Sequence, residues 1–281
     1  MKIYKTISEF VAWRNNSIAE SIGFVPTMGA LHQGHLSLVR NSKQNNVITV
    51  VSIFVNQLQF SPNEDFENYP RNVNEDLNLL EKEGVDVVLL PTHNELYGVD
   101  YGFTISENIL SKKLEGQSRP DFFNGVCTIV CKLFNIVLPT QSFFGMKDIQ
   151  QLIIIKKLVK DLNFNVEIVS CETVRENNGL AMSSRNQYLS DLEKDEASQI
   201  YHCLKQAKIM VEEKQTYSTI IKDFKMNIEK NQEMKVDYVS IANLNTFDEF
   251  NDHEDIKKTD VVISCAVFFK NVRLIDNIVV L

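Results

Sequence analysis

The chain has no apolar run that approaches the ~18 residues of a membrane-spanning helix, so we expect no membrane span. Its first residues lack the apolar core of a secretory signal, and we expect no such signal. Its 5 cysteines are an odd number without paired spacing, which argues against a disulfide framework and favours the reducing cytoplasm. With 29 basic and 37 acidic residues, the net charge of −8 argues against a nucleic-acid partner. We therefore expect a cytoplasmic protein that acts on small molecules.

A length of 281 residues favours two domains, and the N-terminal part alternates between near-continuous apolar runs and stretches of helical spacing. This alternation predicts parallel β/α units. Strands are expected at 22–25, 47–55, 85–90, 142–144 and 165–170, and helices at 35–44, 72–83, 122–137 and 148–161. The prediction is an α/β, Rossmann-like domain with a doubly wound parallel sheet, which binds ligands at the carboxyl ends of its strands.

Beyond residue 180 the pattern changes to polar-rich helices followed by strands. Helices are expected at 191–213 and 216–231, and strands at 236–242, 261–268 and 272–276. These strands predict a small antiparallel sheet, and the chain has no internal repeat, low-complexity tract or Gly/Ser linker. We expect residues 1–176 to form the ligand-binding domain and residues 177–281 a smaller α+β lid domain.

The segment Phe24–His35 joins an expected strand to an expected helix through a turn that contains Gly29. It ends in the pattern H-x-G-H, formed by His32, Gly34 and His35. Backbone N–H groups at a helix start, together with the positive end of the helix dipole, attract anions. Two imidazoles add hydrogen-bond donors whose protonation changes near neutral pH. A lone histidine here would be an ordinary cap, but the combination predicts a site for nucleotide phosphates.

Two further segments carry candidate groups for a small substrate. Val55–Phe60 follows a strand and contains Gln59, whose amide can donate to a carboxylate and accept from hydroxyls without a competing charge. Leu114–Val126 contains Arg119, whose guanidinium can grip a carboxylate or a phosphate at two points. Each segment alone is compatible with a polar loop or a surface salt bridge.

Two later segments carry candidate groups for phosphate. Phe144–Gln151 places Lys147 and Asp148 at a strand end where a helix begins, so a point charge and a hydroxyl acceptor stand together. Val174–Asn186 includes the run Ser183–Arg185, which offers two hydroxyls, backbone N–H groups and a guanidinium for a triphosphate. A helix cap or a serine-rich turn would explain either segment taken alone.

In this order and spacing the segments resemble the motifs of the pantothenate synthetase family, within the H-x-G-H nucleotidyltransferase superfamily. The likeness is strong from Gly23 to Asn186 and returns more weakly at Asp237–Ile241 and Arg273–Asn277. It implies ATP-dependent condensation of pantoate with β-alanine through a pantoyl-adenylate, with release of pyrophosphate and AMP. It also implies that ATP binds with Mg²⁺, for which the sequence indicates no protein ligand. The resemblance further implies a homodimer without a nucleic-acid or membrane partner.

The resemblance also implies roles for individual residues. His35 is the proton donor with His32 beside it, and Lys147 is the third catalytic residue. Gln59 and Gln151 hold pantoate. The residues implied in ATP binding are Met28, Gly29, Ala30, Leu31, His32, Gln33, Gly34, His35, Gly145, Met146, Lys147, Asp148, Val174, Met182, Ser183, Ser184 and Arg185.

The chain departs from the family pattern at four positions. Gln57 stands where proline is usual, and Asn178 stands where aspartate is usual. Asp121 and Phe122 replace the usual glycine and histidine beside Arg119, a secondary candidate for positioning pantoate. Gln57 removes no ligand group, and Asn178 still tolerates the turn geometry. The change to Asp121 and Phe122 leaves the conformation of the loop beside Arg119 open.

Three other functions are compatible with parts of this pattern. A nucleotidylyltransferase would share the H-x-G-H turn, but two neutral glutamines suit a hydroxylated carboxylate better than a second phosphate group. A nucleotide-binding regulator without catalysis would need fewer transition-state donors than His32, His35, Lys147 and the Ser183–Arg185 run provide. An RNA-handling role fits worst, because the chain is acidic.

Overall fold

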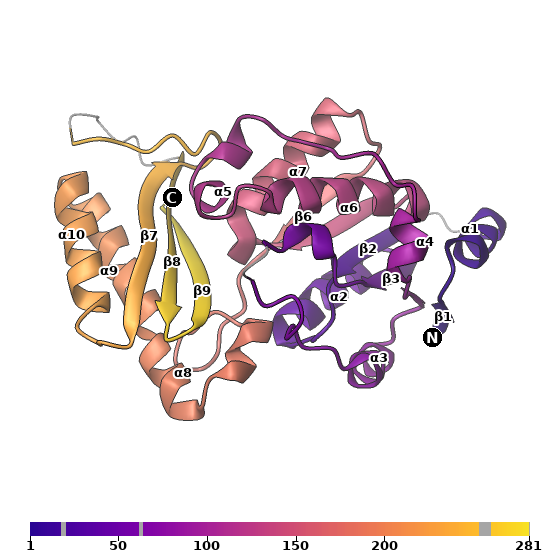
Figure 1. Cartoon of the computed structure of the whole chain (residues 1–281), viewed down its shortest axis with the longest axis horizontal. Coiled ribbons are helices and arrows are strands. Elements are labelled where there is room, and N and C mark those ends of the chain that lie inside the picture. Colours follow the sequence, from indigo (N-terminus) through magenta and orange to yellow (C-terminus); the bar gives the residue numbers. More distant parts are fainter. Residues whose placement is uncertain (18–20, 62–63, 253–259, 281) are drawn as a thin grey trace. The chain divides into compact units, whose positions relative to one another are not determined.

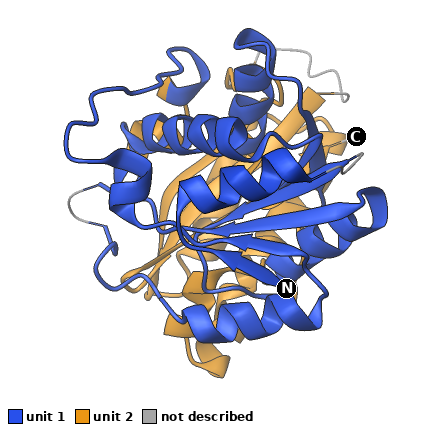
Figure 2. Cartoon of the chain, turned by 90° about the vertical axis from the view of Figure 1, so that its right-hand side faces the viewer, with its two compact units in different colours: residues 1–111, 119–146, 151–172 blue, residues 112–118, 147–150, 173–281 orange. Residues whose placement is uncertain are grey.

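The computed structural model describes residues 1–17, 21–61, 64–252 and 260–280 (Figure 1). Internal contacts divide the chain into two compact units, which Figure 2 colours separately. Unit 1 comprises Met1–Ser111, Arg119–Met146 and Gln151–Glu172, and unit 2 comprises Lys112–Ser118, Lys147–Gln150 and Thr173–Leu281. No helix in the described part of the chain is long and apolar enough to cross a membrane.

Unit 1 is built around a six-stranded parallel sheet in the order β1-β4-β3-β2-β5-β6. Its strands are β1 (Lys2–Tyr4), β2 (Ile22–Thr27), β3 (Ile48–Ile53), β4 (Val87–Leu89), β5 (Gln141–Gly145) and β6 (Glu167–Cys171). Its helices are α1 (Ile7–Asn16), α2 (Gln33–Asn45), α3 (Val73–Lys82), α4 (His93–Tyr97), α6 (Phe122–Val137) and α7 (Ile149–Asp161), the last beginning within unit 2.

Helices cover both faces of this sheet (Figure 2). The alternation of side chains along β2 shows why, because Phe24 lies against Phe134 of α6 while Val25 joins the apolar cluster formed with α2 and α3. Strands β2, β3 and β4 therefore bury both faces, as their near-continuous apolar runs predict. The predicted doubly wound parallel sheet is confirmed.

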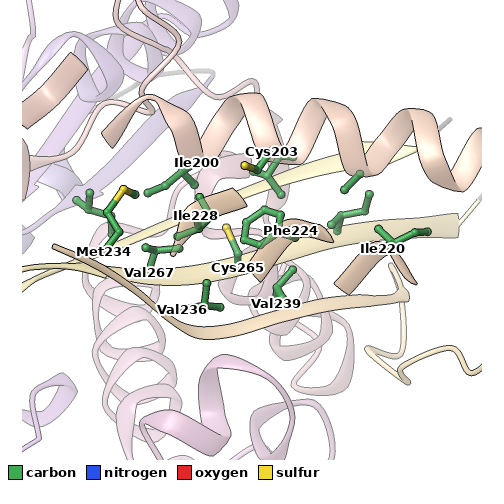
Figure 3. Packing of buried hydrophobic residues seen from close by; sticks show 14 of the residues in the cluster. Ile200, Cys203, Ile220, Phe224, Ile228, Met234, Val236, Val239, Cys265 and Val267 are labelled. Atoms are coloured by element: carbon green, nitrogen blue, oxygen red, sulfur yellow. The ribbon is translucent and has the colours of Figure 1, made fainter. Parts of the chain in front are cut away.

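Unit 2 contains a three-stranded antiparallel sheet in the order β7-β8-β9. Its strands are β7 (Met234–Asn243), β8 (Val261–Phe269) and β9 (Val272–Val280), and its helices are α5 (Glu115–Ser118), α8 (Asp191–Ala197), α9 (Gln199–Glu212) and α10 (Tyr217–Ile228). Figure 3 shows α9 and α10 packing on the sheet through side chains such as Cys203, Phe224 and Val267. The predicted α+β C-terminal fold is confirmed.

Several predicted boundaries were wrong. The helix expected at 191–213 is two helices, because the helix is interrupted at Ser198. The Ser198 hydroxyl donates to the Asp195 carbonyl at 2.6 Å. Strand β9 runs to Val280, and the three-residue edge strand β1 was not predicted, since its side chains are largely exposed. The internal contacts that define the two units also place residues 112–118 and 147–150 in unit 2. The division into domains 1–176 and 177–281 stays a prediction.

Candidate active site

The H-x-G-H turn begins where β2 ends, and its backbone is unusual. Gly29 and Ala30 both have positive φ values, +80° and +50°. The Asp76 carboxylate of α3 accepts the N–H of Ala30 at 3.0 Å and the N–H of Leu31 at 2.7 Å. These two hydrogen bonds stabilise a left-handed conformation that a residue other than glycine seldom adopts.

The two histidines of the motif cap the start of α2 reciprocally. His32 Nδ1 accepts the N–H of Gly34 at 3.1 Å, and His35 Nδ1 lies 3.4 Å from the N–H of His32. The rings lie with centroids 4.1 Å apart. Since Nδ1 is an acceptor in both rings, each neutral imidazole carries its proton on Nε2. The cap therefore leaves Nε2 of each ring as the donor nitrogen.

Five backbone N–H groups of this turn, which was predicted to hold nucleotide phosphates, donate to acceptors within the protein. Gly29 donates its N–H to Thr27 Oγ1 at 3.2 Å. The N–H groups of Ala30 and Leu31 are donated to Asp76, and those of His32 and Gly34 to the imidazoles. Acceptors from Thr27, from Asp76 of α3 and from the two imidazoles therefore hold the turn in its conformation.

Asp76 lies outside the predicted motifs and was not among the predicted site residues. Its carboxylate is buried, with 3% of the residue exposed, and a Cβ added at Gly29 would lie 2.9 Å from its Oδ2. Burial raises the pKa of Asp76 above its ordinary value, although the two N–H donors from Ala30 and Leu31 act in the opposite direction. The sequence pattern could have indicated that Asp76 is buried, because it lies one helical turn before Leu80 on the apolar face of α3.

Gln59 lies in a turn of 3-10 helix, Gln57–Gln59, and its side-chain amide is held at both ends. Its Oε1 accepts from Asn56 Nδ2 at 3.2 Å, and its Nε2 lies 3.0 Å from Met28 Sδ. The Tyr97 hydroxyl in turn donates to Asn56 Oδ1 at 2.8 Å. The structure thus brings Met28 and Gln59 together, through a buried network whose Asn56 and Tyr97 members were not among the predicted site residues.

Gln57, which stands where proline is usual, begins the 3-10 turn Gln57–Gln59, and this turn packs tightly against α6. Gly125 of α6 approaches it so closely that an added Cβ would lie 2.2 Å from the Leu58 carbonyl oxygen. Asn56 Nδ2 also donates to the Gly125 carbonyl at 3.1 Å. Tight packing against α6 supplies the constraint that a proline ring would supply elsewhere.

Arg119 contacts protein groups on several sides. Its Nε and Nη2 donate to the two carboxylate oxygens of Glu64 at 2.8 and 2.5 Å, and Nη2 also donates to the Gln59 carbonyl at 3.0 Å. Its guanidinium carbon lies 3.8 Å from the ring centroid of Phe122, one of the departures from the family pattern. Burial raises the pKa of Glu64, but hydrogen bonds and charge from Arg119, with hydrogen bonds to Ser61, bring it below the ordinary value.

In unit 2, Lys147 and Asp148 lie in a single 3-10 turn just before α7. The side chain of Asn277 on β9 donates to the Lys147 carbonyl at 2.8 Å. Gln150, one residue into α7, accepts from the N–H of Glu115 at 3.1 Å. Gly145, Met146 and Gln151 belong instead to unit 1, so this predicted motif is divided between the two units.

The loop that carries Val174, Met182 and Ser183–Arg185 is also part of unit 2. It folds back on itself, since the N–H of Met182 donates to the Val174 carbonyl at 3.0 Å. Ser183 caps the following turn by accepting the N–H of Arg185 at 3.3 Å. Ser183, Ser184 and Arg185 are therefore presented on a short ordered turn.

Asn178, which replaces the usual aspartate, has its own partners within unit 2. Its Oδ1 accepts the N–H of Leu180 at 3.0 Å, and its Nδ2 donates to Asp195 Oδ1 at 2.8 Å. An aspartate at this position would face the carboxylate of Asp195 with an oxygen. Asparagine therefore suits this position better than aspartate, because its NH₂ group can donate to Asp195 of α8.

Comparisons with known proteins agree with this geometry. A protein-family model described as pantoate-beta-alanine ligase matches residues 2–279. A pantothenate synthetase of Thermosipho melanesiensis is 46% identical over 287 residues, and one of Caldicellulosiruptor bescii is 49% identical over 285 residues. Both alignments cover 100% of this chain and 99% of the relative.

Two solved structures are similar along the whole chain. A pantothenate synthetase from Thermus thermophilus matches with a TM-score of 0.92 at 37% identity, covering 100% of this chain and 99% of the other. A pantoate-beta-alanine ligase from Francisella tularensis, complexed with beta-gamma ATP and beta-alanine, matches with a TM-score of 0.82 at 34% identity. That alignment covers 99% of this chain and 97% of the other.

Proposed function

The chain belongs to the pantoate-beta-alanine ligase family, and we propose that the residues described above carry out the ATP-dependent condensation of pantoate with β-alanine. The observation that carries this conclusion is the family match, which includes every predicted site residue. The Francisella relative, complexed with beta-gamma ATP and beta-alanine, supports two of the three substrates.

ATP is needed because the oxygen of a free carboxylate is a poor leaving group for an amine to displace. A pantoate carboxylate oxygen attacks the α-phosphorus, the bond from that phosphorus to the β-phosphate bridging oxygen breaks, and pyrophosphate leaves. The β-alanine amine then attacks the acyl carbon of the pantoyl-adenylate, AMP leaves, and the nitrogen loses a proton. Negative charge grows on the phosphoryl oxygens in the first step, so donors fixed there in advance lower its barrier.

We assign the donors for the adenylated phosphate and the pantoate contacts to unit 1. His35 and His32 donate from Nε2, which their reciprocal cap leaves as the protonated nitrogen. Gln59 donates to pantoate from Nε2, which rests on the Met28 thioether. Sulfur is a weak acceptor, so a substrate oxygen gives that amide a stronger hydrogen bond. Gln151 is the second pantoate amide of the proposal.

We assign the remaining phosphate contacts to unit 2. Lys147 supplies a point charge, and Asp148 accepts from the ribose hydroxyls. Ser183, Ser184 and Arg185 bind the β- and γ-phosphates from the ordered turn that Ser183 caps. Each of these donors is worth ~2–4 kcal/mol in the transition state, by comparison with oxyanion donors of other enzymes.

ATP is proposed to bind as its magnesium complex. Mg²⁺ keeps several waters and takes phosphate oxygens together with one or two carboxylates. Among the described residues, no group of three or more His, Cys, Asp or Glu side chains could hold a metal ion. The triphosphate and water are therefore expected to supply most of the magnesium ligands.

A cytoplasmic homodimer is also part of the proposal, and it rests on the family likeness. The 5 cysteines are an odd number without paired spacing, which favours a reducing compartment. The division at residues 176 and 177, with closure of the C-terminal domain as a lid, stays a prediction.

The proposed function is tested by mixing the protein with ATP, Mg²⁺, pantoate and β-alanine and measuring AMP and pantothenate. We expect the two products in equal amounts, and pyrophosphate exchange into ATP only when pantoate is present. If AMP formed only with another carboxylic acid, the adenylation reaction would be supported but pantoate would not be the substrate. ATP binding without turnover of any carboxylate would favour the regulator instead.

Arg119 is proposed to position Gln59, because its guanidinium holds the Gln59 carbonyl while Glu64 holds the guanidinium. Arg119→Lys and Glu64→Gln should each raise the KM for pantoate about 3–10-fold, with kcat changed less than about twofold. Because both act through one contact, the double variant should show no larger an effect than either single one. Below the ordinary carboxyl pKa of 4.5 the pair is lost as pH falls through the lowered pKa of Glu64.

The matched control is Arg71→Lys, since Arg71 also stacks on a phenylalanine, Phe66, and donates to nearby carbonyls without contacting Gln59. This variant should leave the KM for pantoate unchanged. A fall of kcat by ~10²-fold in Arg119→Lys at unchanged KM would contradict the positioning role and place the guanidinium on the reacting groups.

A further inference from the structure

We propose that Asp276 and Asn277, consecutive residues of β9, position the two segments of unit 2 that bind ATP. Asp276 acts through Arg175 on the loop that leads to Ser183–Arg185, and Asn277 acts on the backbone of Lys147. The inference rests on the ATP roles proposed above for those segments. It gives the C-terminal strand a function in the reaction.

The alternation of side chains in a strand makes this arrangement possible. Val272, Leu274, Ile278 and Val280 of β9 pack in the apolar cluster with α9 and α10. Asp276 shares their face of the strand, so Asn277 points to the opposite face. Two neighbouring residues can therefore hold segments that lie on different sides of one sheet.

On the first face, Asp276 binds Arg175 through a bidentate ion pair. Arg175 Nη1 and Nη2 lie 2.6 and 3.0 Å from the two carboxylate oxygens. The guanidinium also donates to the Gly179 carbonyl at 3.2 Å and stacks 3.6 Å from the ring centroid of Tyr201. Arg175 is thereby fixed on three sides, and the turn that returns the chain to Ser183 is fixed with it.

The burial of this ion pair shows that it is more than a surface contact. Only 5% of Asp276 is exposed, and burial raises its pKa, while Arg175, the N–H of Asn277 and the charge of Lys147 act in the opposite direction. A carboxylate buried on the apolar face of a strand needs these partners to stay ionised. The charge of Lys147 also reaches Asp276 electrostatically, which links the two segments a second time.

On the second face, Asn277 Nδ2 donates to the Lys147 carbonyl at 2.8 Å. The same segment is held again by Gln150, which donates to the Lys113 carbonyl at 2.8 Å. Glu115, two residues on, is paired with Arg273 of β9 at 2.6 Å. The backbone of Lys147–Gln150 is therefore held by Asn277 of β9. Asp276, the neighbouring residue of β9, holds Arg175.

The test compares Asn277→Ala with Ser264→Ala in pantoate-dependent ATP–pyrophosphate exchange. Ser264 is the residue opposite Asn277 on β8, and its buried hydroxyl has no hydrogen-bond partner among the described residues. Loss of one hydrogen bond to the Lys147 segment should raise the KM for ATP about tenfold, with the KM for pantoate changed less than about twofold. Ser264→Ala should leave both values unchanged.

Two further variants keep the test decisive if Asn277→Ala folds poorly. Asn277→Asp has the same shape but presents an oxygen to the Lys147 carbonyl, so its KM for ATP should rise at least as much. Arg175→Lys keeps a charge opposite Asp276 but loses the bidentate geometry, and it should raise the same constant. A lower Tm with an unchanged ratio of the two KM values would show a structural role only and overturn the inference.

Lys147→Ala separates this inference from the proposed function. If Lys147→Ala raises the KM for ATP and the Asn277 variants do not, only the positioning role is overturned. If Lys147→Ala leaves ATP binding unchanged, the proposed phosphate contact is wrong and the inference fails with it.

Discussion

Replacing His35 with glutamine should lower pantoate-dependent ATP–pyrophosphate exchange by about 10²–10³-fold, the loss seen when one oxyanion donor is removed. The variant should keep the Tm of the unchanged protein, because His35 occupies the N3 position of α2 and accepts the N–H of His32. Glutamine at N3 can accept the same N–H, as it does in other capping boxes. The change therefore removes the imidazole and keeps the cap.

His35→Ala is the paired variant, since it removes the cap and the imidazole together. It should lose about as much exchange activity as His35→Gln and, in addition, ~1 kcal/mol of stability, measured by urea unfolding. His32→Asn repeats the logic at the N-cap, because asparagine is a good cap that can accept the N–H of Gly34. Full exchange activity in His35→Gln would show that the two histidines only shape the helix start.

Five of the six strands in the sheet of unit 1 could be predicted, because β2 to β6 each lie in an apolar run of the sequence. The apolar run of β2 and the turn that follows it are visible in the local sequence. A strand that is buried on both faces can be predicted from such a run alone, without knowing which strands pair with it. The three-residue strand β1 was not predicted. β1 has exposed side chains and exists through its parallel pairing with β4, whose residues lie far along the chain.

The histidine turn was predicted from its residues, but the reason that it holds its shape was not. The motif indicates a helix start and two imidazoles, while the fate of its N–H groups depends on Asp76, 45 residues beyond Leu31. An acidic residue in a helix is usually a solvated one. Its position one turn before Leu80 was the available signal, because a charge on an apolar helix face needs a buried partner.

Arg119 shows a second limit of sequence motifs. A conspicuous arginine beside candidate substrate residues predicts a carboxylate contact, and its residue type fits that role. Glu64 is 55 positions away and belongs to no motif, so the ion pair that holds Arg119 cannot be seen in the sequence. The same holds for Asn277, whose contact with Lys147 spans 130 positions.

Asp76→Asn should lower ATP–pyrophosphate exchange by about 10²-fold and the free energy of unfolding by about 1–3 kcal/mol. The carboxylate accepts the N–H groups of Ala30 and Leu31 with separate oxygens, whereas an asparagine amide has one oxygen and would turn its NH₂ toward the other donor. The N–H left without an acceptor lies in a partly buried turn, and Ala30 loses a support of its positive φ. Both histidines follow this turn directly, so a shift of ~1 Å there misplaces two donors at once.

Glu75→Gln is the control for this prediction, since it removes the neighbouring charge from the same helix. Glu75 is exposed, and its carboxylate accepts from the side chain of Asn72, outside the histidine turn. The variant should leave exchange and stability close to those of the unchanged protein. A double variant Asp76→Asn with His35→Gln should lose little more activity than His35→Gln alone, because a misplaced donor and a missing donor remove the same interaction. Activity losses that multiply would show instead that Asp76 supports the reaction by a route that does not pass through the histidine turn.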